Sequence, residues 1–360
     1  MDEQTINELE FENAQLSVDL NLTRFDGCML MFDQLVSMQA HVQNYGIDRT
    51  FLALYNNHGQ LTDMCGTAIP SCESILSDYE LNRQYFEVCM EGFTSAIRDA
   101  GLWVIKQFKR LLNWIGEMWK RFWNIFQESG GSKKVKNKVE KLRKSKLVKK
   151  IMVRNFAMHN DPNINTYINE VINLLKVDSK GNITPEQEKR LTELLSILKG
   201  MYDEGKKGKG DKPVEKITLQ SDGDKNNYLN MVLTEDANIE KAVKAVGLAV
   251  AQLKGLEAQI EQNIQQQAAN PDAHKDEKLK KNLKDKDQNI NNKWSKQLKE
   301  TRDLISILSH VMKHILNNRK VMQDDLNIIY KACDEITSVN SDFAKTNEKY
   351  NERHPGNPVS

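Results

Sequence analysis

Apolar residues recur every three or four positions through most of the C-terminal half, and this periodicity constrains the fold more than any other feature. Helical spacing gathers such residues on one face, which each helix must bury against another helix. The chain has only 7 prolines in 360 residues, so little interrupts long helices. We therefore predict an all-α protein of long amphipathic helices in an antiparallel bundle. The clearest stripe comprises Ile239, Ala242, Val243, Val246, Ala249, Val250, Leu253, Leu256, Ile260 and Ile264.

Capping and breaking residues set the expected bounds of the N-terminal and central helices. A helix pair is predicted over residues 163–175 and 185–201, where Thr184, Pro185 and Gln187 form an N-terminal capping signal. Other helices are predicted over residues 1–43, 49–58, 78–100, 102–127 and 133–156. The first of these is expected to bury Leu9, Leu16, Leu20, Met31, Leu35, Met38 and Val42.

The C-terminal part is predicted to contain three more helices. One is capped by Thr234, a second runs from about Asp276 to Ile315, and a third runs from Met322 to Ile336. The Gly/Lys-rich loop at 205–227 has room for a short β-hairpin arm over 214–219. The tail around 354–358 holds two prolines and a glycine, and we expect it to be disordered.

Charge divides the chain into three expected regions. Residues 1–101 hold 4 Lys/Arg and 16 Asp/Glu, whereas residues 102–160 hold 16 Lys/Arg and 3 Asp/Glu. The net charge of the whole chain is only +1, so this separation is hidden in the average. We predict an acidic helical region over 1–101, an aromatic helix with a basic helix over 102–156, and a helical bundle over 157–360.

The sequence predicts neither secretion nor a membrane span. The five cysteines are odd in number and show no CxxC spacing, which favours reduced thiols. The N-terminus begins Met-Asp-Glu-Gln and shows no signal-peptide pattern. Charges interrupt every window of 18 residues, so no transmembrane helix is expected.

Enzymatic motifs are missing from the sequence. It contains no GxGxxG, no GxxxxGK[ST], no GxSxG and no Cys/His cluster with zinc spacing. We therefore predict no catalytic residues, no cofactor and no metal site, and expect a protein that is not an enzyme.

The segment 102–127 is an aromatic helix with one narrow polar stripe. Three interpretations stay open: a core helix, an interfacial membrane helix, or a surface for self-association or docking to a capsid. Under the last two, the interface or membrane anchors are Trp103, Phe108, Trp114, Trp119, Phe122, Trp123 and Phe126.

The segment 133–154 carries eleven cations and a single acid, Glu140. Like charges at helical spacing repel, so a polyanion such as DNA or anionic lipid is expected to offset them. The run lacks aromatic residues between the charges, so we expect nucleic-acid contacts without sequence preference. The predicted polyanion-binding residues are Lys133, Lys134, Lys136, Lys138, Lys141, Arg143, Lys144, Lys146, Lys149, Lys150 and Arg154.

These features together resemble the internal head proteins of large tailed bacteriophages. The resemblance rests on the acidic N-terminal region, the junction Ile69-Pro-Ser-Cys-Glu-Ser-Ile75, the stretch IKQFKRLLNWIGEMWKRFWNIF and the lysine run after it. It implies a nonenzymatic structural protein of the virion, located in the capsid interior and, during assembly, in the host cytoplasm. Its implied partners are packaged DNA, capsid or other virion proteins, and further copies of itself.

The resemblance also implies trimming by a prohead protease. Ser71, Cys72 and Glu73 fit the pattern of a small residue, any residue and glutamate, so the cut would precede Ser74. Residues 1–73 carry 11 acids and 2 basic residues, and we expect this segment to lie against the basic helix until assembly. The alternative function is a membrane-active helical protein, either pore-forming or injected, whose aromatic helix makes transient contact with a bilayer surface.

Overall fold

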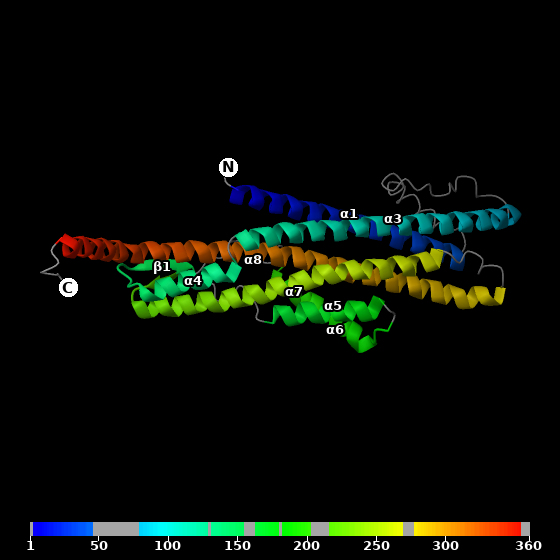
Figure 1. Ribbon diagram of the computed structural model, residues 1–360. Helices are drawn as coiled ribbons and strands as arrows, with labels where there is room; N and C mark the ends of the chain where they lie inside the picture. The colour runs from blue at the N-terminus through cyan, green and yellow to red at the C-terminus, as the bar shows by residue number, and fades with distance from the viewer. Residues whose placement is uncertain are drawn as a thin grey trace.

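The computed structural model describes residues 3–45, 79–128, 131–154, 163–179, 182–202, 216–268 and 277–353. These residues form an elongated bundle of helices with one small sheet of two strands (Figure 1). The predicted all-α class is therefore confirmed. Helix 49–58 and the tail at 354–358 lie outside the described residues.

Two long antiparallel helices run along most of the molecule (Figure 1). Helix α7 spans Asp222–Ala268, and α8 spans Glu277–Arg353. The 77 residues of α8 correspond to about 115 Å at 1.5 Å per residue. The two helices predicted on either side of residue 320 are thus one helix. A fully buried ion pair joins the two long helices, with Arg319 3.2 Å from Asp236.

A second antiparallel pair lies along this hairpin and consists of α1, Glu3–Tyr45, and α3, Tyr79–Glu128. Its seam follows a seven-residue repeat, the pattern of a coiled coil. On α1 the buried a positions are Phe11, Val18, Phe25 and Phe32, and the buried d positions are Ala14, Asn21, Cys28 and Leu35. On α3 the matching buried residues are Val104, Phe108, Leu111, Ile115, Met118 and Phe122.

The register of the α1–α3 pair follows from its aromatic contacts. The rings of Phe11 and Phe122 lie 6.4 Å apart, and those of Phe25 and Phe108 lie 5.9 Å apart. Helix α3 is continuous across residues 101 and 102, where two helices and a region boundary were predicted. That boundary marks a change of charge inside one helix.

The predicted core face of α1 is wrong over its first half. Leu9, Leu16 and Leu20 are exposed, because α1 carries apolar residues on two opposite faces and only the face with the phenylalanines meets α3. Met31, Leu35 and Met38 are buried as predicted.

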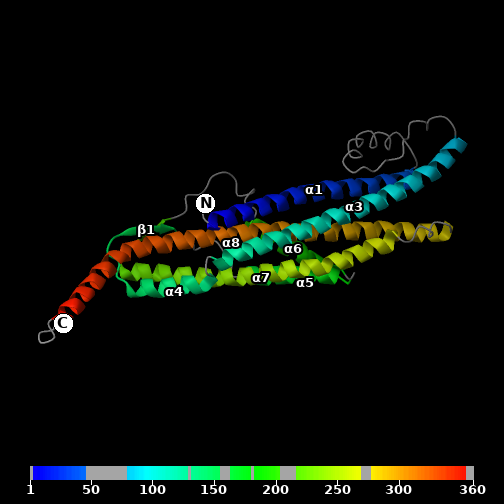
Figure 2. The same cartoon turned by 45° about the horizontal axis from the view of Figure 1, so that its top comes forward.

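Helix α1 also lies beside α8 (Figure 2), and acidic residues of α1 meet basic residues of α8 along this second seam. Asp33 lies 2.6 Å from Lys299, Asp26 lies 2.6 Å from Arg302, and Glu8 lies 3.1 Å from Lys320. The residue numbers rise on one helix as they fall on the other, so α1 is antiparallel to α8 as well.

The helix pair predicted in the middle of the chain is confirmed as α5, Ile164–Ser179, and α6, Pro185–Tyr202. The predicted capping signal is also confirmed. The Thr184 amide donates to Gln187 Oε1 at 3.0 Å, and the Gln187 amide donates to Thr184 Oγ1 at 3.3 Å. Arg190 of α6 joins Glu170 of α5 through two hydrogen bonds.

The start of α7 differs from the prediction, which placed it at Thr234. The Thr234 hydroxyl instead donates to the Asn230 carbonyl inside the helix. The true cap is Ser221, whose hydroxyl accepts from the Asp224 amide at 3.1 Å while its own amide donates to Asp224 Oδ2 at 3.0 Å. This reciprocal capping box is a recognised helix-start signal.

Candidate polyanion-binding surface

Helix α4, Gly131–Lys144, is held to the bundle by one apolar stripe. Val135, Val139 and Leu142 are buried at the spacing of one helix face, and they pack against α7 and α8. Gly131 has a φ of 53°, a conformation that glycine adopts without strain. Because the apolar stripe takes up the inner face, most lysines of α4 point outward.

Nine of the eleven predicted cations are exposed. They lie on the outer side of α4 and on the irregular segment 145–150 that follows it. We call this set the basic ridge. It comprises Lys133, Lys134, Lys136, Lys141, Arg143, Lys144, Lys146, Lys149 and Lys150.

The basic helix is shorter than predicted, because it ends at Lys144 and not at residue 156. Beyond Lys144 the backbone finds partners elsewhere in the fold. The Leu147 amide donates to Asp222 Oδ1 at 2.8 Å, and the Val148 amide donates to the Ala332 carbonyl at 3.4 Å. Ending the helix also spreads its charges, which reduces repulsion between lysines one turn apart.

A buried lysine fixes the turn after α4. Lys225 is 1% exposed, and its ammonium donates to the Ser145 carbonyl and to Asp222 Oδ1. Hydrogen bonds from Lys225 and from the Leu147 amide hold the pKa of Asp222 below its usual value. The path of residues 145–150 is therefore set by the first turn of α7.

Residues 151–154 form a strand where a helix was predicted. Strand β1, Ile151–Arg154, pairs antiparallel with β2, Lys216–Leu219, in the register Ile151 with Leu219. The strand expected within 214–219 is thus confirmed, but its partner lies more than 60 residues earlier in the chain. β-Branched residues such as Ile151, Val153 and Ile217 favour this extended form.

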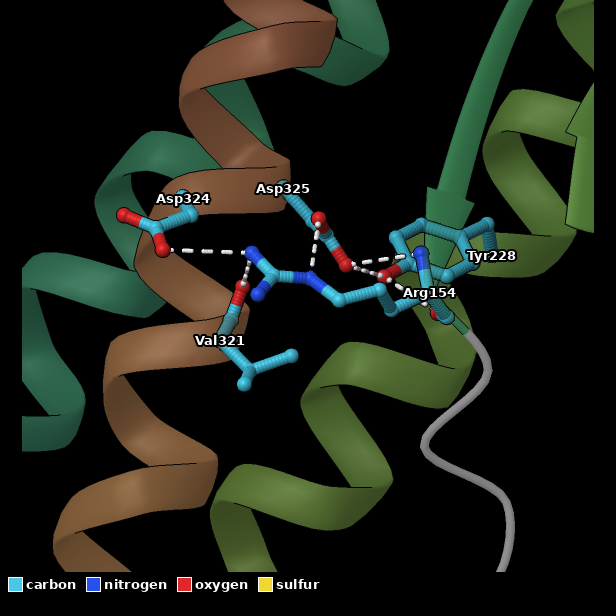
Figure 3. A network of polar contacts seen from close by, with 5 residues as sticks. All are labelled: Arg154, Tyr228, Val321, Asp324 and Asp325. Atoms are coloured by element: carbon cyan, nitrogen blue, oxygen red, sulfur yellow. Dashed lines mark hydrogen bonds and ion pairs between the residues drawn. The ribbon is translucent and has the colours of Figure 1, made fainter. Parts of the chain in front are cut away.

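Arg154 belongs to an internal network and not to the basic ridge (Figure 3). Its Nε donates to Asp325 Oδ1 at 3.1 Å, and its Nη2 donates to Asp324 Oδ2 at 3.1 Å and to the Val321 carbonyl at 3.4 Å. The Tyr228 hydroxyl lies 2.9 Å from Asp325 Oδ2. We therefore leave Arg154 out of the basic ridge.

Burial and the charge of Asp325 act in opposite directions on the pKa of Arg154 but in the same direction on the pKa of Tyr228. Burial alone would lower the pKa of Arg154, but hydrogen bonds and charges from Asp324 and Asp325 raise it. Burial, together with the charge of Asp325, raises the pKa of Tyr228 well above its usual value. Asp325 and Tyr228 were not among the predicted site residues, and they lie 171 and 74 positions from Arg154.

Lys138 is also turned away from the ridge. It is half-buried and donates to Asn327 Oδ1 of α8. Burial lowers the pKa of the Lys138 ammonium. We therefore assign Lys138 to the contact between α4 and α8.

The aromatic residues of α3 mostly belong to the core. Phe108, Phe122 and Phe126 are buried, and Trp103 and Trp119 are half-buried against the core. These five side chains support the core interpretation and are not available as surface anchors in this fold. Trp114 and Trp123 are more open, at 36% and 40% exposed.

The expected contact between the acidic N-terminal region and the basic helix is wrong for α1. Its described ion pairs reach α3 and α8, with Glu10 3.2 Å from Arg121 and Asp26 2.6 Å from Arg302. The predicted cleavage residues Ser71, Cys72, Glu73 and Ser74 lie outside the described residues.

No described helix is long and apolar enough to cross a membrane. Within the same residues, no cluster of three or more His, Cys, Asp or Glu side chains has the arrangement of a metal site. No family model, curated protein or solved structure matches this chain.

Proposed function

We propose that this protein is a nonenzymatic structural component of a bacteriophage virion, located inside the head, and that it contacts packaged DNA through the basic ridge. The observation that supports this proposal is the concentration of nine exposed cations on α4 and residues 145–150, where Glu140 is the one acid. The location inside a virion follows from the family resemblance.

The shape of the ridge suits a nucleic-acid backbone. The 14 residues of α4 span about 21 Å at 1.5 Å per residue, which is long enough to reach several successive phosphates. Phosphate contacts by lysine release counterions and make binding depend strongly on salt. Since the ridge has no aromatic side chain to stack on bases, the contact carries no sequence preference.

The rest of the molecule acts as a rigid support. Val135, Val139 and Leu142 anchor α4 to the α7–α8 hairpin, so the lysines are presented on a fixed surface. Membrane activity gains little support from the fold, because five of the seven aromatic residues predicted to anchor it belong to the core or pack against it.

The test is a salt titration of DNA binding with the full chain. Replacing Lys133, Lys134, Lys141 and Lys144 with Gln removes four outward charges. If all four contact phosphate, the slope of log K against log salt should fall by about 3.6. Affinity should fall equally for unrelated duplexes.

A matched control removes four charges elsewhere. Lys106, Lys189, Lys241 and Lys244 are exposed and lie on α3, α6 and α7. Replacing them with Gln gives the same net charge but should leave the slope close to that of the unchanged protein. If both variants lose DNA affinity and salt slope equally, the ridge is not the DNA-binding surface.

A further inference from the structure

The outward face of α1 is apolar although nothing described in the structure covers it. Leu9, Leu16, Leu20 and Leu30 are 46%, 66%, 51% and 56% exposed. In the seven-residue repeat that places Phe11 at position a, Leu9, Leu16 and Leu30 occupy position f, and Leu20 occupies position c. We call these four residues the leucine face.

The leucine face is also free of charge along its length. Between residues 9 and 34, the remaining c and f positions are Asn13, Thr23, Gly27 and Gln34. The acids at position b include Asp26 and Asp33, which pair with α8. A continuous exposed apolar stripe on a soluble bundle commonly marks a protein interface.

We infer that the leucine face binds the same face of a second copy of this chain, with the two α1 helices antiparallel. In this pair, the f positions of one α1 helix would pack in layers with the c positions of the other, as a and d positions do in a coiled coil. Centring the pair on residue 18 places Leu16 opposite Leu20 of the second copy, and Leu9 opposite Gly27. A Cβ built on Gly27 meets no atom within 4 Å, so there is open space for the leucine.

Charges along one edge of the face favour this direction. At position g, Glu10 is 53% exposed and Arg24 is exposed. An antiparallel pair brings the g positions together, so Glu10 of each copy faces Arg24 of the other. These two pairs follow from the twofold symmetry of the contact.

The other edge brings acids together, but α8 offsets their charge. Asp19 of the two copies would approach each other there. Burial raises the pKa of Asp19, while the positive charges of His310 and Lys313 on α8 act to lower it. Arg302 pairs with Asp26 on the same edge.

Trp114 of α3 extends the apolar surface next to Leu20. Trp114 lies seven residues before Arg121, so the two side chains share one position in the repeat of α3. Arg121 pairs with Glu10 of α1. By the same register Trp114 lies beside Ser17, close to the twofold axis. Its 36% exposure leaves part of the indole available to the second copy.

Sedimentation equilibrium of the full chain tests the inference. The unchanged protein should be a dimer at micromolar concentration. The variant Leu16→Gln/Leu20→Gln should weaken the dimer by at least about 100-fold, since it removes four leucines from the symmetric contact. The control Leu248→Gln/Ile328→Gln changes residues of α7 and α8 that are 54% and 39% exposed, and it should remain a dimer.

Cross-linking tests the direction of the helices. Ser17→Cys should join to itself across the twofold axis on mild oxidation, whereas Thr23→Cys should not. Mass spectrometry of the linked peptides separates these products from those of the natural cysteines. A Thr23→Cys self-link would show a parallel pair and overturn the register.

Three other results would show that the leucine face is not a dimer interface. A protein that stays monomeric at about 100 μM would refute the inference. So would a dimer that survives Leu16→Gln/Leu20→Gln, or binding of the leucine face to liposomes by a monomer. These results leave DNA binding by the basic ridge untouched, because the two surfaces share no residue.

Discussion

Replacing Gly247 with Ala tests how closely α7 packs against α3. A Cβ at Gly247 would lie 2.7 Å from Cζ2 and 3.1 Å from Cη2 of Trp119, well inside normal contact distance. The indole has little room to move, because its ring lies 5.3 Å from that of Phe122 and 5.8 Å from that of Trp123.

Two opposing effects set the size of the change. Alanine is favoured over glycine in a helix interior by about 1 kcal/mol. Overpacking a tight site costs about 1–3 kcal/mol. We expect the clash to dominate, so Gly247→Ala should lower the free energy of unfolding by about 1 kcal/mol.

Gly255 provides the matched control on the same helix. A Cβ there meets no atom within 4 Å, so Gly255→Ala should raise the free energy of unfolding by up to about 1 kcal/mol. Urea unfolding followed by circular dichroism measures both variants. If Gly247→Ala stabilises the protein as much as Gly255→Ala does, the close α3–α7 contact is refuted.

Three further predictions concern other parts of the molecule. Burial, reinforced by Asp178, Glu188 and Asp303 and opposed by Lys296, raises the pKa of Glu300 to about 7. The stabilising contribution of Glu300 should be complete below about pH 4.5 and lost as pH rises through 7. Glu300→Gln should therefore stabilise the protein at pH 8 but not at pH 4.5. Parallel pH profiles of the free energy of unfolding for the two proteins would contradict this. Arg154→Gln should lower the free energy of unfolding by about 2 kcal/mol yet leave the salt slope of DNA binding unchanged, and a reduced slope would return Arg154 to the ridge. A chain cut after Glu73 should keep its N-terminal fragment bound during size-exclusion chromatography, because α1 packs on α3 through Phe11, Val18, Phe25 and Phe32; separation without denaturant would disprove that.

Local signals made the helical class and several helix bounds predictable. Thr184 and Gln187 form their capping box because both partners lie within one turn. The same signal at Ser221 and Asp224 was present in the sequence, but the surrounding lysines and glycines suggested a loop.

Long-range contacts explain what the sequence did not reveal. Helix α1 has leucines on one face and phenylalanines on another, and only contact with α3 decides which face is buried. Arg154 looks like one more cation in a basic run, since nothing near it in the chain points to Asp325. Strand β1 depends in the same way on β2, which follows more than 60 residues later.

The candidate site was predicted best where it depends on composition alone. The lysines of the basic ridge lie outward, because Val135, Val139 and Leu142 take the inner face of α4. The aromatic helix was open to three interpretations, because its apolar arc is wide enough for a core, a membrane or an interface. Packing against α1 and α7 places most of that arc inside the protein.

Chemical cross-linking of protein to DNA inside intact phage particles tests the central proposal most directly. Formaldehyde joins lysines to nearby bases, and mass spectrometry then locates the linked peptides. We expect adducts on peptides that contain Lys133, Lys134, Lys141, Lys144 and Lys146, at higher yield than on peptides with the exposed Lys189, Lys241 or Lys244. Adducts spread evenly over all exposed lysines, or the absence of this protein from particles treated with protease on the outside, would contradict the proposal.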